Sequence, residues 1–529
     1  MNRKTRIALL LLILVIGAAF RLLDLHTIPP GLFPDEAMNG NNLHEALGTG
    51  DFKVFYKENN GREGFFINLQ SLSVLAFGHT AFALRFASAL FGIATILALY
   101  LFSRAYFRND RIALLAAFFI ATGFWHIMFS RIGFRAIMAP FFLTAGLWGI
   151  YRAYDLRHDT KHWRPLAISA LGGILFGLGF HSYIAYRAAP ILLLPIFWLF
   201  VKEARTHRNA CIVCVPAIFV LMALLTTIPL LLYFTEYPQD FFGRTSQISI
   251  FSSPNPLAAL ATNIVKTIGM FYVAGDFNWR HNYAGHPTLW WPLAIFFTIG
   301  IAESIRKRYA LILMWMFVMM LPVLISSEGI PHALRAIILI PPTFILVAVG
   351  FDLVWQAILA WLKKAEVTHS EASSIIKRIR AWTSVLAIVF LGTSMAYTFN
   401  LYFQKWAVRP HVADAFEKDL YTTGVLIARQ PDSLPKYVIV SEVDSIDISG
   451  RPMALQPILF ATRTYRPDPP GAHGVWYLTA QELDRVICNP DCMIFPLSNF
   501  HKIGDKLKER IPNLKAKSED GILFFAPQQ

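Results

Sequence analysis

Two adjacent carboxylates, Asp35 and Glu36, directly follow Pro34 near the start of the chain. Proline suits the first position of a helix, and we predict a helix from Pro34 through Leu47 that ends at Gly48. Neighbouring residues in a helix point about 100° apart, so the two acids are expected to have different tasks. One interpretation is that they only stabilise the helix dipole. The other is that a carboxylate held here acts as a general base, which makes Asp35 and Glu36 candidate catalytic residues.

Arginines in aromatic and apolar surroundings form a second group of candidates. A guanidinium at membrane depth costs on the order of 3 kcal/mol and needs a partner. Each arginine can pair with a carboxylate such as Glu58 or Asp276, or extend to lipid headgroups. A convergent set instead suits a phosphate, whose oxygens accept paired hydrogen bonds from guanidinium groups. The set is Arg21, Arg62, Arg85, Arg131, Arg135, Arg187, Arg244, Arg280 and Arg335.

The composition shows what kind of chain must position these residues. Of the 529 residues, 55% are hydrophobic and only 16% are charged, compared with roughly 25% charged residues in a soluble domain. A single soluble enzyme is therefore excluded. The net charge is +14, but the basic residues form short clusters between apolar runs, as in cytoplasmic loops, so no nucleic-acid partner is expected.

About eleven apolar segments are predicted to cross the membrane, at about 20 residues each. Every second loop between them is basic, which places the N-terminus in the cytoplasm. We expect a multi-pass protein of the cell inner (plasma) membrane, with the loop from Leu25 to Phe65, the stretch from Tyr233 to Thr288 and the C-terminal tail outside. The predicted spans lie near residues 7–25, 82–102, 112–129, 136–151, 166–181, 188–201, 211–233, 288–304, 310–326, 336–362 and 382–402.

The composition becomes that of a globular domain near residue 404. We predict a transmembrane domain over residues 1–403 and a small extracytoplasmic α/β domain over residues 404–529. Cys488 and Cys492 would then lie in an oxidising compartment, where they form either a short-loop disulfide or two free thiols. The predicted strands are Tyr437–Val440 and Ile522–Ala526, and the predicted helices are His411–Arg429 and His501–Arg510.

The chain resembles membrane glycosyltransferases of the GT-C class, specifically the bacterial members of the protein O-mannosyltransferase and lipid A aminoarabinose transferase superfamily. The resemblance rests on one short span followed by Pro34-Asp35-Glu36-Ala37 in a long first outer loop that carries Gly61-Arg62-Glu63-Gly64, and on Phe129-Ser130-Arg131. It covers roughly the first 350 residues. It implies an all-helical membrane domain with membrane-parallel helices in the first outer loop, and a sugar donor carried on a polyprenyl phosphate.

The resemblance also implies a mechanism for these residues. Asp35 would accept the proton of an acceptor hydroxyl as it attacks the anomeric carbon, so that the anomeric centre inverts and the polyprenyl phosphate departs. Arginines would stabilise the charge on that phosphate, and Glu36 and Glu63 would hold the sugar or orient an arginine. The acceptor is a protein, a lipid or a glycan. The residues predicted to bind substrate are Arg62, Glu63, Arg131, Arg135, Arg187, Arg280, His281, His332 and Arg335.

Two questions stay open at this level. No cofactor is required by the mechanism, but histidines near the predicted outer face, His281 and His332 among them, can complete a divalent metal site with carboxylates. The second question is the class of function, because arginines within a membrane can also line the path of a lipid-linked sugar flippase or another transporter. Transporters usually contain internal repeats, and we find no repeat in this chain.

Overall fold

The computed structural model describes residues 1–206, 211–247, 249–369, 371, 373–440, 446, 452–466 and 471–528. The chain divides into two compact units. The first, here called the membrane unit, contains Met1–Leu23 and Ser88–Trp406. The second, the loop unit, contains Asp24–Ala87 and Ala407–Gln529. The loop unit thus combines the predicted first outer loop with most of the predicted C-terminal domain. The predicted boundary between residues 403 and 404 stays a prediction.

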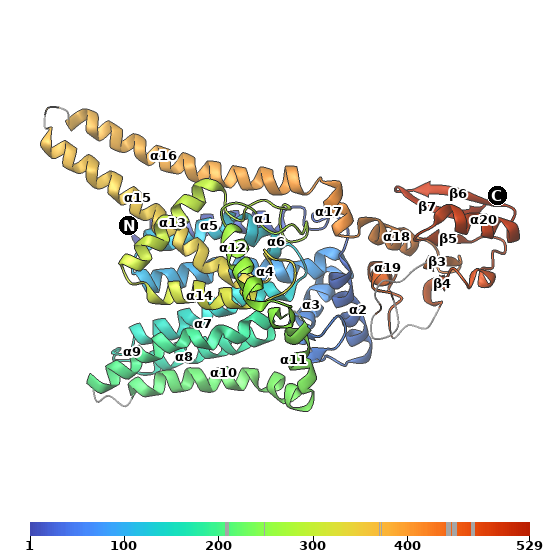
Figure 1. The fold of residues 1–529 in the computed structure, drawn as a ribbon, viewed down its shortest axis with the longest axis horizontal. Helices are drawn as coiled ribbons and strands as arrows, with labels where there is room; N and C mark the ends of the chain where they lie inside the picture. The colour runs from blue at the N-terminus through green and yellow to red at the C-terminus, as the bar shows by residue number, and fades with distance from the viewer. Residues whose placement is uncertain are drawn as a thin grey trace. The chain divides into compact units, whose positions relative to one another are not determined.

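The membrane unit is a bundle of helices, in which α7, α8 and α10 run side by side (Figure 1). Glycines permit the close approach of α7 and α8, because a methyl group added to Gly149 would lie 2.4 Å from the Cα atom of Gly172. The helices are α1 (Arg3–Leu22), α4 (Ala81–Phe107), α5 (Asp110–Thr122), α6 (Phe124–Ser130), α7 (Met138–Asp155), α8 (Trp163–Leu178), α9 (Leu193–Thr206), α10 (Cys211–Glu236), α11 (Pro238–Gln247), α12 (Pro256–Gly269), α13 (Trp291–Arg306), α14 (Ala310–Leu324), α15 (Ile340–Thr368) and α16 (Ser373–Phe399). The first turns of α4 belong to the loop unit.

Each of the eleven predicted spans coincides with a helix or a pair of helices. Among the described residues, seven helical segments are long and apolar enough to cross a membrane, or eight if α5 and α6, which meet at an angle of 59°, form one bent span. The helices α13 and α14 are shorter, with 16 and 15 residues. A multi-pass membrane protein is therefore supported, whereas the number of eleven spans stays a prediction.

The loop unit begins with the helix that carries the two acids. This helix, α2, runs from Pro34 to Thr49, with proline at its first position as predicted. It ends later than predicted, because Gly50 and not Gly48 adopts the left-handed conformation, with φ of 77°, and donates its N–H to the carbonyl of Ala46. The segment continues through the paired strands β1 (Phe55–Tyr56) and β2 (Arg62–Glu63) to α3 (Gly64–Phe77).

The C-terminal part of the loop unit contains a five-stranded sheet in the order β4-β3-β5-β7-β6. The central strand β3 is parallel to β4 and β5, and β7 is antiparallel to β5 and β6. Neighbouring residues of β3 belong to different hydrophobic clusters: Val438 packs with α18 and α19, and Ile439 packs with α20. The elements are α17 (Pro410–Ala415), α18 (Lys418–Ala428), β3 (Lys436–Val440), α19 (Gln456–Thr462), β4 (Val475–Thr479), β5 (Met493–Pro496), α20 (Phe500–Arg510), β6 (Leu514–Glu519) and β7 (Ile522–Pro527).

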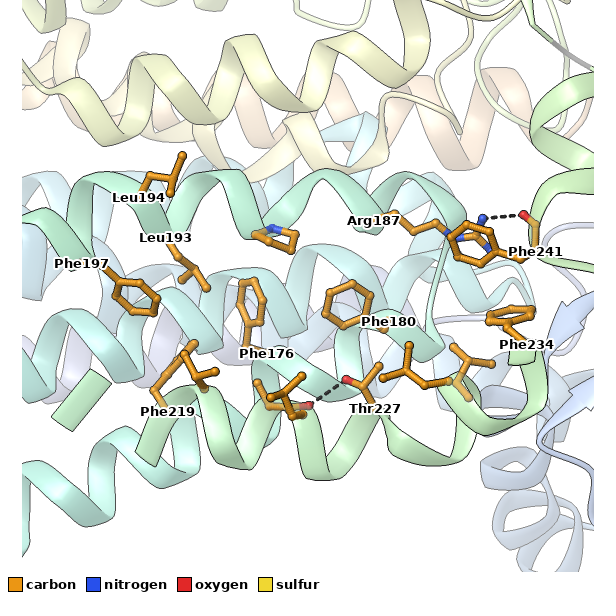
Figure 2. A pocket seen from close by; sticks show the side chains of 16 residues that line it. Phe176, Phe180, Arg187, Leu193, Leu194, Phe197, Phe219, Thr227, Phe234 and Phe241 are labelled. Carbon is orange, nitrogen blue, oxygen red and sulfur yellow. Dashed lines mark hydrogen bonds between the residues drawn. The ribbon is translucent and has the colours of Figure 1, made fainter. Parts of the chain in front are cut away.

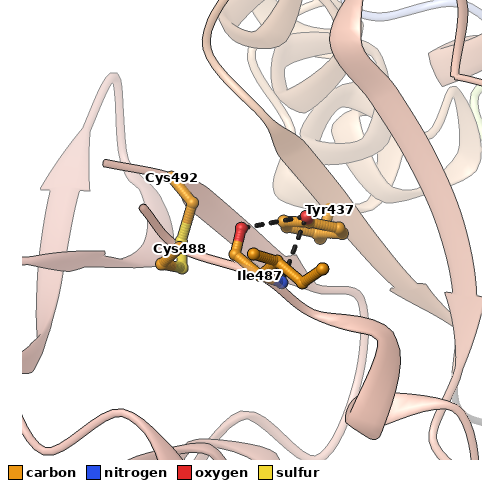
Figure 3. The surroundings of a disulfide bond; sticks show 4 residues. All are labelled: Tyr437, Ile487, Cys488 and Cys492. Atoms are coloured by element: carbon orange, nitrogen blue, oxygen red, sulfur yellow. Dashed lines mark hydrogen bonds between the residues drawn. A yellow bond between two sulfur atoms is a disulfide. The ribbon is translucent and has the colours of Figure 1, made fainter. Parts of the chain in front are cut away.

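The structure tests two predictions for this part, one about a helix and one about the two cysteines. The helix expected over His411–Arg429 is divided into α17 and α18, because Glu417 adopts a positive φ of 49° and stops the first helix. Cys488 and Cys492 form a disulfide, beside the Tyr437 hydroxyl group that donates to the carbonyl of Ile487 (Figure 3).

Candidate active site

The two acids of α2 lie in different environments. Glu36 is fully buried, and its carboxylate forms an ion pair with Arg85, with 3.1 Å between Oε1 and Nε. The same carboxylate accepts the backbone N–H of Phe33, so it also caps the start of α2. The remaining Arg85 donors reach the carbonyls of Pro29 and Gly31. Glu36 therefore holds an arginine and fixes the entry to α2, which was one of the two tasks predicted for it.

Asp35 occupies the adjacent position and is only partly buried. Within the described part of the chain, no hydrogen bond or ion pair engages its side chain. A carboxylate without partners inside the protein keeps its lone pairs for a ligand, and it can accept a proton from a hydroxyl group placed within hydrogen-bond distance. The predicted division of tasks between neighbouring acids thus agrees with their surroundings.

Arg62 lies in a buried polar network next to α2. Its guanidinium donates to the side-chain oxygens of Asn39, at 2.6 Å, and of Asn42, at 2.5 Å. These two asparagines are three residues apart and so share one face of the helix. Glu58 adds a backbone carbonyl at 3.2 Å and a carboxylate oxygen at 3.9 Å. Glu63, also buried, is the neighbour of Arg62 in β2. The network links α2 firmly to the β1–β2 hairpin.

The C-terminal part of the loop unit also contacts α2. The Asn41 amide donates to the side chain of Gln456 at 2.7 Å and to its backbone carbonyl at 3.1 Å. Arg466 forms ion pairs with Glu45 at 3.2 Å and with Glu58 at 3.4 Å. Residues more than 400 positions later in the chain therefore help to hold the helix that carries Asp35.

The arginines of the membrane unit find a different kind of partner. Arg21 is buried and donates to the carbonyls of Gly17, Ala121 and Ile120, and contacts the His126 ring at 2.7 Å. The expectation of an anionic partner is wrong for Arg21, because the break between α5 and α6 leaves carbonyl groups that its guanidinium satisfies. The side chain of Arg244 lies outside the described residues.

Arg131 follows the same pattern. This buried side chain donates to the carbonyls of Phe20 and Leu23, at 2.9 and 2.6 Å, at the end of α1. Its guanidinium also lies over the rings of Tyr402 and Phe403, about 5 Å from each centroid. Arg131 thereby supplies hydrogen-bond donors to the carbonyl groups at the end of α1. A role in substrate binding stays a prediction for it, as it does for Arg135, which is partly buried in a short 3-10 helix, Arg135–Ile137.

Two loops of the membrane unit bring together predicted residues that are far apart in the sequence. His281 and His332 stack with ring centroids 5.0 Å apart, and both face the carboxylate of Asp276. The Asp276 carboxylate also accepts the backbone N–H groups of Asn278 and Ala333, each at 2.8 Å. Arg280 lies within the first of these loops. Arg335 pairs with Glu328 at 3.2 Å and also donates to its carbonyl and to Ser326.

The electrostatics of this group follow from burial and close contact. Burial alone raises the pKa of Asp276, but the hydrogen bond with His281, the charge of His281 and the backbone N–H of Asn278 reverse this and lower the pKa below its ordinary value. Burial, assisted by the neighbouring His281, lowers the pKa of His332 to about 3. His332 is therefore neutral at pH 7, with a ring nitrogen available as an acceptor or a ligand.

Arg187 lies apart from these residues, at one end of an apolar groove with a cavity volume of about 500 Å³. Figure 2 shows phenylalanine side chains along the groove and the Arg187 guanidinium against Phe241. The guanidinium donates to the Phe241 carbonyl at 2.8 Å and lies 3.9 Å from the centre of that ring. A groove of this kind suits a hydrocarbon chain.

Sequence reasoning gave several residues of the site no role of their own. Arg85 was included in the arginine set but not among the predicted site residues. Asp276 was considered only as a partner for an arginine, although it precedes His281 by five residues. Asn39, Asn42 and Gln456 carry no charge and gave no signal, because neutral amides are common in any loop or helix.

Comparison with known proteins agrees with this architecture. A family model described as dolichyl-phosphate-mannose-protein mannosyltransferase matches residues 65–233. No curated protein matches the chain. The solved structure of the oligosaccharyltransferase AglB from Archaeoglobus fulgidus, in complex with an inhibitory peptide and a dolichol-phosphate, is 16% identical with a TM-score of 0.52. That match covers 88% of this chain but only 65% of AglB, so the chain spans less than two thirds of its length.

The second similar protein matches over nearly its whole length. ArnT from Cupriavidus metallidurans in the apo state is 14% identical, with a TM-score of 0.55, and the match covers 99% of this chain and 98% of ArnT. The same ArnT bound to undecaprenyl phosphate gives a TM-score of 0.54 at 14% identity, with the same coverage. At this identity the likeness shows the fold. The chain has the fold of GT-C class glycosyltransferases, and the predicted resemblance to that class is confirmed.

Proposed function

We propose that this protein is an inverting glycosyltransferase that moves a sugar from a polyprenyl-phosphate donor to an acceptor hydroxyl at the outer face of the membrane. The observation that carries the proposal is the contrast within α2: Glu36 is buried and paired with Arg85, whereas Asp35 is partly exposed and without a partner among the described residues. This contrast supports Asp35, rather than Glu36, as the acid that acts on a substrate in this proposal.

The reaction requires one proton transfer and one displacement. The Asp35 carboxylate accepts the proton of the acceptor hydroxyl while that oxygen bonds to the anomeric carbon. The bond from the anomeric carbon to the phosphate oxygen breaks, and the polyprenyl phosphate leaves as an anion. Because the attack comes from the side opposite the leaving group, the anomeric centre inverts. General-base assistance of this kind typically contributes about 10²–10⁴-fold to the rate.

Arginines bind the phosphate in this proposal and stabilise the charge that grows on it. The candidates are Arg62, Arg131, Arg280 and Arg335. The lipid part of the donor is supported by the fold, since structures with this fold include an ArnT bound to undecaprenyl phosphate and an AglB with a dolichol-phosphate.

The proposal is tested with full-length protein in proteoliposomes that contain radiolabelled polyprenyl-phosphate sugars, with membranes of the producing cells as the source of acceptor. Asp35→Asn keeps the size of the side chain but removes the base, so transfer is expected to fall by about 10²–10⁴-fold while donor binding persists. Asp51→Asn is the matched control, because Asp51 is an exposed acid of the same loop. Transfer by Asp35→Asn at the unmodified rate contradicts the assignment.

A further inference from the structure

Asp276, His281 and His332 form a compact group of side chains that the proposed reaction does not use. One ligand atom from each side chain lies within 4.8 Å of the other two. Asp276 and His281 are buried, with about 5% of each side chain exposed, and His332 is 16% exposed. The group joins the loop between α12 and α13 to the loop between α14 and α15. These two loops also carry Arg280 and Arg335.

The distances within the group suit a shared ion. The Asp276 Oδ2 atom is 3.2 Å from His281 Nδ1 and 3.7 Å from His332 Nδ1. Ligand atoms around a tetrahedral ion, with metal–ligand bonds of about 2.0–2.1 Å, are separated by roughly 3.3 Å. The two distances bracket this value. The second is also too long for a good hydrogen bond.

A hydrogen-bonded arrangement alone does not account for His332. The backbone N–H of Arg335 points to His332 Nδ1 at 3.4 Å, which is a long contact for a hydrogen bond. The Asp276 Oδ2 atom that faces it is an acceptor as well, and already accepts the backbone N–H of Ala333 at 2.8 Å. The 3.7 Å distance between the two atoms is thus too long for a good hydrogen bond, and an ion bound by both atoms would replace this contact.

We propose that Asp276, His281 and His332 bind one divalent ion of the zinc type. Two imidazole nitrogens and one carboxylate oxygen are a typical ligand set for Zn²⁺, whereas Mg²⁺ and Ca²⁺ prefer oxygen ligands throughout. The backbone N–H groups of Asn278 and Ala333 fix the carboxylate, as outer-shell donors commonly do at metal sites.

The ion has a structural consequence and a chemical one. It fastens two loops that are about 50 residues apart in the sequence, and it thereby fixes the backbone next to Arg280 and Arg335. Three protein ligands leave a fourth position, which water or another oxygen ligand fills. The two neighbouring arginines add positive potential there, so an anionic oxygen is favoured at that position.

The experiment measures metal directly and needs no sugar donor, so its outcome is independent of the proposed function. Full-length protein in detergent is loaded with zinc, dialysed against metal-free buffer and analysed by elemental mass spectrometry. We expect about one zinc per chain and a higher thermal midpoint with zinc than with chelator. Protein that retains no zinc and melts identically with zinc and with chelator overturns the proposal.

Variants show whether the bound ion sits at these residues. Asp276→Asn and His332→Gln are expected to reduce zinc retention at least tenfold. His286→Gln is the matched control, because His286 lies in the same loop but bonds to Pro287 and Tyr397. Equal loss of zinc in the control overturns the assignment. If the first two variants fail to fold, His332→Cys loaded with Co²⁺ is expected to show a thiolate-to-cobalt charge-transfer band. Stoichiometric cobalt without that band also overturns it.

Discussion

Buried arginines of the loop unit meet carboxylates and side-chain amides, whereas buried arginines of the membrane unit donate mainly to backbone carbonyls. Arg85 pairs with Glu36, and Arg62 with Asn39 and Asn42. Arg21, in contrast, donates to three carbonyls near the ends of helices. Both solutions supply acceptors to the guanidinium, but only the first adds a buried negative charge.

The difference changes what a buried arginine indicates. A guanidinium in apolar surroundings needs acceptors, and the carbonyls at a helix end supply them without any anion. A buried arginine in a membrane protein therefore does not by itself indicate a site for phosphate. Arginines in the loops between spans are better candidates, and Arg280 and Arg335 are two such residues.

The sharpest test of this difference is removal of Arg85. Arg85→Met leaves the fully buried Glu36 without its partner, and breaking a buried ion pair in this way costs about 3–5 kcal/mol of unfolding free energy. The matched control is Arg429→Met, because the Arg429–Asp520 pair is largely exposed and contributes at most about 1 kcal/mol. Chemical denaturation of the purified protein, followed by tryptophan fluorescence, measures both. Equal losses in the two variants refute the assigned role of the buried pair.

Arg131 tests the other half of the comparison. Arg131→Met leaves the carbonyls of Phe20 and Leu23 without this donor, and each unpaired buried acceptor costs about 1–3 kcal/mol. We therefore expect a lower thermal midpoint for Arg131→Met, and weaker binding of a polyprenyl phosphate with little change in midpoint for Arg335→Met. A thermal shift assay with and without the lipid separates the two effects. The reverse pattern makes Arg131 the phosphate ligand.

The start of α2 could be predicted from the sequence because Pro34 has a fixed φ and lacks an N–H group, both of which favour the first position of a helix. Its end could not, since Gly48 and Gly50 are equally able to adopt a positive φ and only the fold selects Gly50. Likewise, nothing local to residues 411–429 indicates that Glu417 adopts a positive φ and divides the helix in two.

The site was also predictable only in part, because the contacts of its residues depend on the fold. Residue type identified Asp35, Glu36, His281 and His332 as groups able to do chemistry. The partners of these groups depend on contacts between distant segments. Asp276 meets His332 across two loops, and Asn41 meets Gln456 across 415 positions. Such pairs leave no periodic pattern in one sequence, so their assignment had to come from the structure.

The disulfide gives the loop unit a covalent restraint in addition to its ion pairs. Cys488 and Cys492 close a short loop beside β5, and loop-closure entropy for so few residues predicts a stabilisation of about 2 kcal/mol. A reductant is expected to lower the thermal midpoint of the loop unit and to make hydrogen exchange in β5 faster. The double variant Cys488→Ser/Cys492→Ser is the control, because its exchange should not respond to reductant. Unchanged exchange of the unmodified protein in reductant contradicts this restraint.

The last expected effect concerns a histidine of the loop unit. His79 stacks on Phe460, with 4.0 Å between ring centroids, and contacts its carbonyl at 3.0 Å. Burial, assisted by the neighbouring His44 and Arg463, lowers the pKa of His79 to about 3. An unfolded histidine titrates near pH 6.5, so between these two values the unfolded chain binds the additional proton. The contribution of neutral His79 to stability is therefore complete above about pH 6.5 and is lost as the pH falls toward 3.

The variant His79→Gln isolates this effect, because glutamine occupies a similar volume and does not titrate. Thermal midpoints measured from pH 7 to pH 4.5 are expected to fall less steeply for His79→Gln than for the unmodified protein. His501→Gln is the matched control, since His501 is an exposed histidine of the same unit, and its profile should match that of the unmodified protein. If the His79→Gln profile is instead parallel to that of the unmodified protein, the packing of His79 against Phe460 does not depend on its charge.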